Sequence, residues 1–116
     1  MRKLLPIMAA AFAASSTPAL AQAGNFTIVN ATGIDFSGLA VRRFGTRQWL
    51  PLTVSPVPLR NTARGSANFK DEDCAFDLRA TLPDGRTVVW PGVNLCQVKV
   101  VTLNQKADGA LWVDYQ

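Results

Sequence analysis

The segment CAFDLRATL, residues 74–82, alternates between apolar side chains and side chains of mixed polarity. Cys, Phe, Leu, Ala and Leu occupy its even-numbered positions, whereas Asp77 and Arg79 occupy odd-numbered positions. A period of two is typical of a β-strand with one face in the core and the other in solvent. Pro83-Asp84-Gly85 follows directly, so the pattern predicts a tight hairpin that leads into a returning strand at residues 87–90.

Short alternating runs separated by turn residues continue in both directions from this hairpin. The runs predicted as strands are residues 26–30, 36–44, 49–52, 66–69, 74–82, 87–90, 96–103 and 110–115. No segment keeps a helical period. We therefore predict an all-β fold: a two-sheet antiparallel β-sandwich of seven or eight strands with an immunoglobulin-like layout, or alternatively a small open β-barrel. An exposed edge strand is expected near residues 66–69, where a partner could add a strand.

The two cysteines fall on the two arms of the predicted hairpin. A hairpin centred on Asp84-Gly85 places Cys74 and Cys96 opposite each other at its open end. They are the only cysteines of the chain. Their spacing is not that of a C-x-x-C redox motif, which is the alternative interpretation of such a pair. The register therefore predicts a structural Cys74–Cys96 disulfide.

The N-terminal residues have the pattern of a bacterial Sec-type export signal. Arg2 and Lys3 precede an apolar run of 11 residues, 4–14, and small residues follow it. The run is much shorter than the roughly 20 residues of a membrane-spanning helix. We predict that residues 1–23 form a cleaved signal peptide, with cleavage after Ala21 or Ala23, and that residues 24–116 form the β-sandwich domain. The mature protein is expected in the periplasm or secreted, with no membrane span.

Composition limits the chemistry available to the chain. Of its 116 residues, 48% are hydrophobic, which excludes intrinsic disorder, and none is His. The net charge is +4, from 12 Lys and Arg against 8 Asp and Glu. Arg2 and Lys3 are the only charged residues before position 24, so a mature chain has a net charge of only +2. We predict a protein that is not an enzyme, that holds no cofactor or metal, and that does not bind nucleic acid.

Two groups of charged residues are candidate sites. Arg42, Arg43 and Arg47 form the most basic segment and would attract an anion or an anionic envelope surface, although a dispersed solvated face is the alternative. Asp77 and Arg79 point off the same strand face. They are expected to form a surface ion pair, or Arg79 to bond a neighbouring backbone, with a small enzyme or inhibitor site as the alternative.

Two further features admit more than one interpretation. Asp71-Glu72-Asp73 offers oxygen ligands for a hard cation, but the spacing of a calcium loop is missing and a solvated loop is favoured. Trp49, Trp90 and Trp112 would serve as stacking platforms for a ligand or, as favoured in so small a domain, fill the core or its rim.

Several of these segments together carry a resemblance to a known family. They are FTIVNATG at 26–33, Trp49, CAFDLRA at 74–80, Asp84-Gly85, Trp90 and VNLC at 93–96. In them the chain resembles a family of short exported bacterial proteins of unassigned role, whose members are variously described as uncharacterised, as Tat pathway signal proteins or as argininosuccinate lyases. Arg2-Lys3 is not a twin-arginine pair, and a chain of this length without predicted helices does not fit that lyase.

The resemblance implies a secreted, disulfide-linked β-domain and supplies no catalytic residue. Asp77, Arg79 and Asn94 lie inside the matching motifs and are the polar positions to test first. The predicted function is that of a non-catalytic binding or structural accessory protein of the periplasm. Its expected partner is another envelope protein or an anionic surface.

Overall fold

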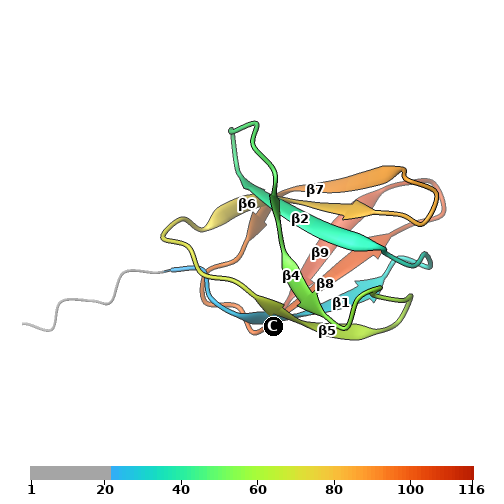
Figure 1. Ribbon diagram of the computed structural model, residues 1–116, viewed down its shortest axis with the longest axis horizontal. Helices are drawn as coiled ribbons and strands as arrows, with labels where there is room; N and C mark the ends of the chain where they lie inside the picture. Colours follow the sequence, from blue (N-terminus) through green and yellow to red (C-terminus); the bar gives the residue numbers. More distant parts are fainter. Residues whose placement is uncertain (1–21) are drawn as a thin grey trace, which may run out of the picture.

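The computed structural model describes residues 22–116, which contain nine strands and no helix (Figure 1). The strands are β1 (Phe26–Ala31), β2 (Gly38–Arg43), β3 (Leu50–Pro51), β4 (Thr53–Ser55), β5 (Arg64–Asn68), β6 (Ala75–Thr81), β7 (Thr87–Asn94), β8 (Val100–Gln105) and β9 (Leu111–Tyr115). The predicted signal peptide, apart from its last two residues, lies outside the described residues. Within residues 22–116 we find no helix with the length and hydrophobicity needed to cross a membrane.

Two sheets make up the domain. One has the order β4-β5-β1-β8-β9 and the other the order β3-β2-β6-β7. The predicted all-β, two-sheet sandwich is confirmed, and the strands of residues 22–116 do not close into a barrel. Where a single strand was predicted at residues 49–52, the chain passes from one sheet to the other, so β3 pairs with β2 whereas β4 pairs with β5. Buried Leu52 lies at the crossing.

One pairing and one edge differ from the prediction. All ladders are antiparallel except that between β1 and β8, in which Thr27 lies beside Val100 and the strands run parallel. The run predicted as an exposed edge near residues 66–69 forms part of β5, which is not an edge. It lies between β1 and β4, because the three residues of β4 return alongside it.

The core lies between the two sheets and follows the alternation seen in the sequence. Its strand residues include Phe26 and Ile28 of β1, Phe76, Leu78 and Ala80 of β6, Trp90 of β7, and Val101 and Leu103 of β8. Trp90 is fully buried, packs edge-to-face on Phe36 and donates its indole N–H to the carbonyl of Asn104 at 3.1 Å. Trp90 is therefore a core residue, with its one polar atom satisfied.

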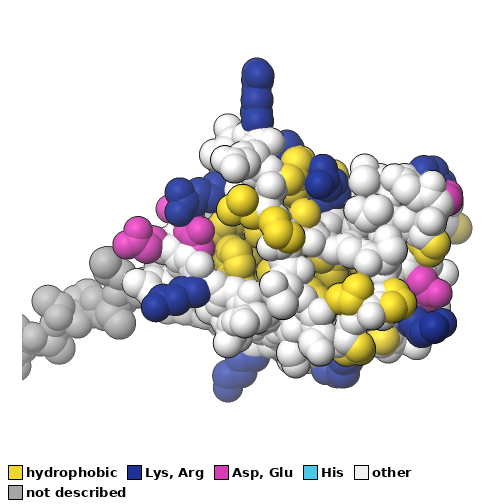
Figure 2. All heavy atoms as spheres, in the orientation of Figure 1, with side chains coloured by type: hydrophobic (Ala, Val, Ile, Leu, Met, Phe, Trp, Pro, Cys, Tyr) yellow, Lys and Arg dark blue, Asp and Glu magenta, His cyan; other side chains and the backbone are white. Residues whose placement is uncertain are grey.

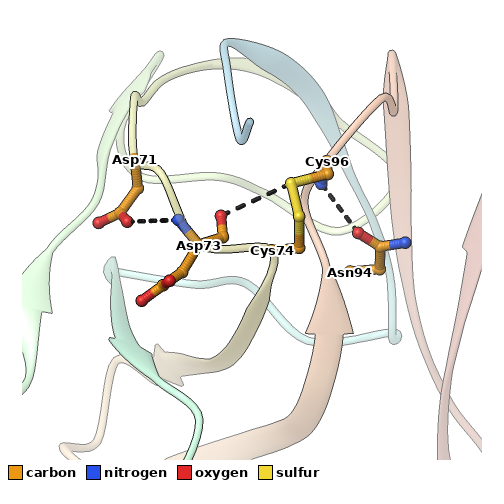
Figure 3. Close-up of a disulfide and its surroundings, with 5 residues drawn as sticks. All are labelled: Asp71, Asp73, Cys74, Asn94 and Cys96. Atoms are coloured by element: carbon orange, nitrogen blue, oxygen red, sulfur yellow. Dashed lines mark hydrogen bonds between the residues drawn. A yellow bond between two sulfur atoms is a disulfide. The ribbon is translucent and has the colours of Figure 1, made fainter. Parts of the chain in front are cut away.

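The predicted disulfide is confirmed. Cys74 and Cys96 are joined at the open end of the β6–β7 hairpin, with their Cα atoms 5.0 Å apart (Figure 3). The side chain of Asn94 accepts a hydrogen bond from the backbone N–H of Cys96 at 2.9 Å. Ala23 bridges to both Asp71 and Cys96, so the start of the described chain is fastened at the same place. The disulfide thus links the residue before β6 to the segment that follows β7.

Candidate functional site

The outer face of the four-stranded sheet carries three of the residues singled out in the sequence. In the ladder, Arg42 on β2 lies opposite Asp77 on β6, and Arg79 lies two positions further along, opposite Ala40. Successive side chains of a strand point to opposite faces. Because Val41 and its partner in the ladder are core residues, the three charged side chains point away from the core.

Asp77 is buried even though it lies on this outer face. Only 4% of the residue is exposed. Its Oδ2 accepts a hydrogen bond from Nε of Arg42 at 2.8 Å, and its Oδ1 accepts one from the backbone N–H of Gly92 at 3.0 Å. The predicted surface ion pair between Asp77 and Arg79 is therefore wrong. The partner is Arg42, because the cross-strand neighbour lies closer than a residue two positions away on the same strand.

A bulge in the β6–β7 ladder supplies the second of these hydrogen bonds. The register shifts between Phe76 and Leu78. Asp77 consequently faces two residues of β7, Pro91 and Gly92, rather than one. Proline has no N–H, so the donor is Gly92, whose positive φ of 65° suits a residue without a side chain.

Trp49 packs against both arginine side chains of this face. The guanidinium carbons of Arg42 and Arg79 each lie 4.4 Å from the centroid of its ring. A cation at this distance over an indole ring is attracted by the electrons of the ring face. The half-buried indole thus contacts both guanidinium groups. We call Arg42, Trp49, Asp77 and Arg79 the Trp49 cluster.

Arg79 is the charged member of the cluster that has no polar partner among the described residues. Its Nε is buried and makes no hydrogen bond to any of residues 22–116. Its guanidinium also forms no ion pair in that part of the chain, whereas Arg42 is paired with Asp77. The cluster therefore has one uncompensated positive charge, located at Arg79.

A shallow trough of about 300 Å³ lies beside the cluster. Its lining includes Gly38 and Ala40 of β2, Trp49 and Pro51 from the next strand and its approach, and Arg79 and Thr81 of β6. We call it the Gly38 trough. A side chain added at Gly38 would meet no heavy atom within 4 Å, so the space above this residue is open. The uncompensated charge of Arg79 thus borders a concave surface.

A second pocket, of about 280 Å³, adjoins the Gly38 trough: Leu50 lines both, and Arg42 of the Trp49 cluster lines the second pocket. Val41, Leu50, Phe69 and Phe76 contribute its apolar lining, and Phe69 packs edge-to-face on Phe76. Figure 2 shows apolar side chains between β2 and β5, with acidic side chains of the loop before β6 at one end of that face. Among the residues described, no buried polar side-chain atom of this pocket lacks a partner, and we do not assign it a ligand.

Arg43 and Asp71 form an ion pair at the rim of the second pocket. Nη2 of Arg43 lies 3.2 Å from Oδ1 of Asp71, and its Nε lies 3.0 Å from Asp73. The hydrogen bond to Asp71, and then the charges of both carboxylates, raise the pKa of Arg43. Burial alone would raise the pKa of Asp71, but hydrogen bonds from the backbone of Asp73 and from Arg43 outweigh it and hold the pKa below its usual value.

This ion pair predicts a loss of stability in acid. The pKa of Asp71 is lower in the folded than in the unfolded chain, so its carboxylate stabilises the fold above the unfolded pKa of about 3.9. That contribution disappears as the pH falls through the lower folded pKa. We expect the melting temperature to fall between about pH 5 and about pH 2, and to fall less in Asp71→Asn. Circular dichroism melts of both proteins measure it, with Asp108→Asn as the control, and equal falls in all three would contradict it.

The other predicted site residues are dispersed. Arg47 is exposed, and Arg43 is engaged at the second pocket, so the structure does not gather Arg42, Arg43 and Arg47 into one basic patch. The side chain of Asn94 accepts a hydrogen bond from the backbone N–H of Cys96. The backbone N–H of Asn94 donates to the hydroxyl of Tyr115 at 3.0 Å. Asn94 therefore contributes to the join between the disulfide and β9.

The acidic loop and the third tryptophan are the two remaining candidates from the sequence. Asp71 caps the backbone N–H of Asp73, and the described residues contain no group of three acidic, His or Cys side chains placed to hold a metal ion. Trp112 is 40% exposed, and the ammonium group of Lys106 lies 5.6 Å from its ring centroid. Trp112 is therefore a rim residue of the five-stranded sheet.

Sequence reasoning did not identify Gly38, Gly92 or the link between Trp49 and the arginines. For Gly38 the available signal was a glycine inside a predicted strand, which marks bulges and places of close approach. Gly92 lies outside the predicted strands. Comparison of the chain with protein-family models, curated proteins and solved structures finds no match. The interpretation of the site therefore rests on its own geometry.

Proposed function

We propose that this chain is a non-catalytic binding protein of the bacterial envelope, periplasmic or secreted, whose binding surface is the outer face of the β3-β2-β6-β7 sheet. Its Cys74–Cys96 disulfide supports an oxidising compartment, because such bonds persist outside the cytoplasm. The signal pattern of residues 1–23 supports export. A resemblance to short exported proteins is consistent with both.

The observation that carries the proposal is Arg79. A buried N–H without a partner destabilises a protein by about 1–3 kcal/mol. Arg79 has such a group, and its side chain is nevertheless held on Trp49 next to an open trough. Groups of this kind often serve function rather than stability. We infer that a ligand or partner in the trough binds the guanidinium group of Arg79 and supplies its negative counter-charge.

The rival functions are less well supported by the same contacts. Asp77 already accepts two hydrogen bonds and is buried, so it is poorly placed to act as a general base. Arg42 and Arg43 are both paired with carboxylates, which weakens their attraction for an anionic surface. Among the charged groups discussed, Arg79 is the better candidate for recognition.

Site-specific photocrosslinking in living bacteria tests the proposal. A benzophenone amino acid is placed at Pro51 or Thr81, on the proposed face, and at Ser66 or Thr102, on the outer face of the other sheet. We expect a defined adduct from the first pair of positions and none from the second. The adduct should disappear when Arg79→Gln is added. Intact mass of the recovered protein should show an N-terminus at residue 22 or 24.

Three results would refute the proposal. One is an absence of adducts from both faces. Another is the same adducts from both faces, which would mean that contact is not specific to this sheet. The third is recovery of the protein from the cytoplasm with residues 1–23 still attached. Each is read by mass spectrometry of the same purified samples.

A further inference from the structure

We infer that the Gly38 trough binds a carboxylate group and that Arg79 receives it. This inference rests on the proposed function and names the chemistry of its ligand. The trough lies between a wall formed by Trp49 and Pro51 and a wall that contains Arg79. Three properties of the trough lead to this ligand class: the shape of its floor, the balance of its charges and the geometry of its cation.

The floor of the trough is made by residues with little or no side chain. Gly38 and Ala40 occupy successive outward positions of β2, between the two walls. The backbone conformation does not require glycine at position 38, because its φ is not positive. Nothing lies within 4 Å of the position where its side chain would be. The absence of a side chain at Gly38 therefore leaves the surface open at this end of β2, where a ligand can approach the backbone.

The charge balance favours a ligand with a single negative charge. Arg42 and Asp77 compensate each other at 2.8 Å, and Arg79 has no acidic partner within the described chain. One bound carboxylate would bring the cluster to neutrality, whereas a phosphate dianion would leave excess negative charge beside Asp77.

The geometry of the cation favours a planar acceptor. A guanidinium is a flat group with five N–H donors, and it matches the two oxygens of a carboxylate. Packing of Arg79 on Trp49 fixes that plane before the ligand arrives, which reduces the entropy lost on binding. A trough of about 300 Å³ lies at the small end of the range for ligand sites. The bound part is therefore a small acidic unit, such as one residue of an acidic peptide or one sugar acid.

Nuclear magnetic resonance of the disulfide-bonded protein purified after export tests the inference. The signals followed are the side-chain N–H groups of Arg79 and Trp49. The probes are N-acetylglycine, as a peptide carboxylate, and glucuronate, as a sugar acid. N-acetylglycinamide and the methyl ester of glucuronate are their uncharged analogues, and inorganic phosphate is a different anion. We expect saturable chemical-shift changes at both side chains with at least one of the two carboxylates. Its uncharged analogue and phosphate should each bind at least tenfold more weakly.

Matched variants connect the binding to the trough. Arg79→Gln removes the cation, Gly38→Leu fills the floor, and Arg64→Gln removes an exposed arginine of the other sheet. We expect the first two to weaken carboxylate binding at least tenfold and the third to leave it unchanged. Melting curves of each variant report its folding separately. Should Gly38→Leu fail to fold, Arg79→Gln still decides the result.

The two proposals can fail separately. Three results would each overturn the carboxylate assignment. They are equal chemical-shift changes with the carboxylates and their uncharged analogues, tighter binding of phosphate, and unchanged carboxylate binding in Arg79→Gln. Adducts confined to Pro51 and Thr81 would in that case still support the binding face. Carboxylate binding in the trough with adducts from both faces would support the ligand class and contradict the proposed function. Preference for N-acetylglycine or for glucuronate identifies the source of the carboxylate.

Discussion

Replacement of Cys96 by alanine is expected to destabilise the domain by about 2–5 kcal/mol, the usual effect of losing a native disulfide from a small exported domain. The bond closes a loop between residues 22 positions apart and so restricts the unfolded chain. In the chain-entropy model a loop of about this length contributes roughly 3 kcal/mol. We expect a lower melting temperature in a thermal scan and less protein recovered from the periplasm.

Reduction supplies the matched control for this prediction. The melting temperature of the natural protein in reductant should be close to that of Cys96→Ala without reductant. Cys74→Ala should have the same melting temperature as these two. Reductant should not change either variant, since the described residues contain no free cysteine and each variant has only one thiol. A natural protein that melts at the same temperature with and without reductant would show that the bond contributes nothing.

Replacement of Asp77 by alanine is expected to destabilise the domain by about 2–4 kcal/mol, because buried donors lose their acceptor. The change leaves the Gly92 N–H and the Nε of Arg42 without the carboxylate. It also puts the uncompensated charges of Arg42 and Arg79 on one tryptophan ring. Thermal or urea unfolding measures the loss.

A double-mutant cycle with Arg42→Ala separates the ion pair from the bond to Gly92. If the pair matters, the double variant should be less destabilised than the sum of the two single variants. The destabilisation that Asp77→Ala still causes in an Arg42→Ala background measures the hydrogen bond from the Gly92 N–H. Additive effects would mean that Arg42 and Asp77 do not stabilise each other. A fully stable Asp77→Ala would contradict the importance of both contacts.

Local patterns in the sequence were sufficient for most of the strands and for the disulfide, but not for the split between β3 and β4. The alternation of residues 74–82 places Phe76, Leu78 and Ala80 in the core because a strand exchanges faces at every residue. The turn at Asp84-Gly85 fixes the register of the hairpin, which brings the two cysteines together. These features depend on neighbours along the chain or on one tight turn.

The site depended on contacts that such patterns do not contain. Alternation assigns Asp77 to the outer face, and that is where it lies. Its burial comes from side chains outside its own strand, including Arg42, and from a bulge opposite it. The spacing of Asp77 and Arg79 suggested an ion pair between them, but the order of strands in the sheet decides which charges meet. Trp49 joins the cluster from the segment before β3, and its sequence position alone gives no sign of this.

The parallel ladder between β1 and β8 has a consequence for how the polypeptide acquires its native form. Thr27 lies beside Val100, 73 positions later in the chain, so the middle of the larger sheet has very high contact order. Pairings of this kind form slowly, since a long loop must close before any hydrogen bond compensates for it. A chain that crosses a membrane as an extended thread therefore stays unable to complete this sheet until nearly all of it has emerged. Strand topology alone would keep translocation ahead of folding.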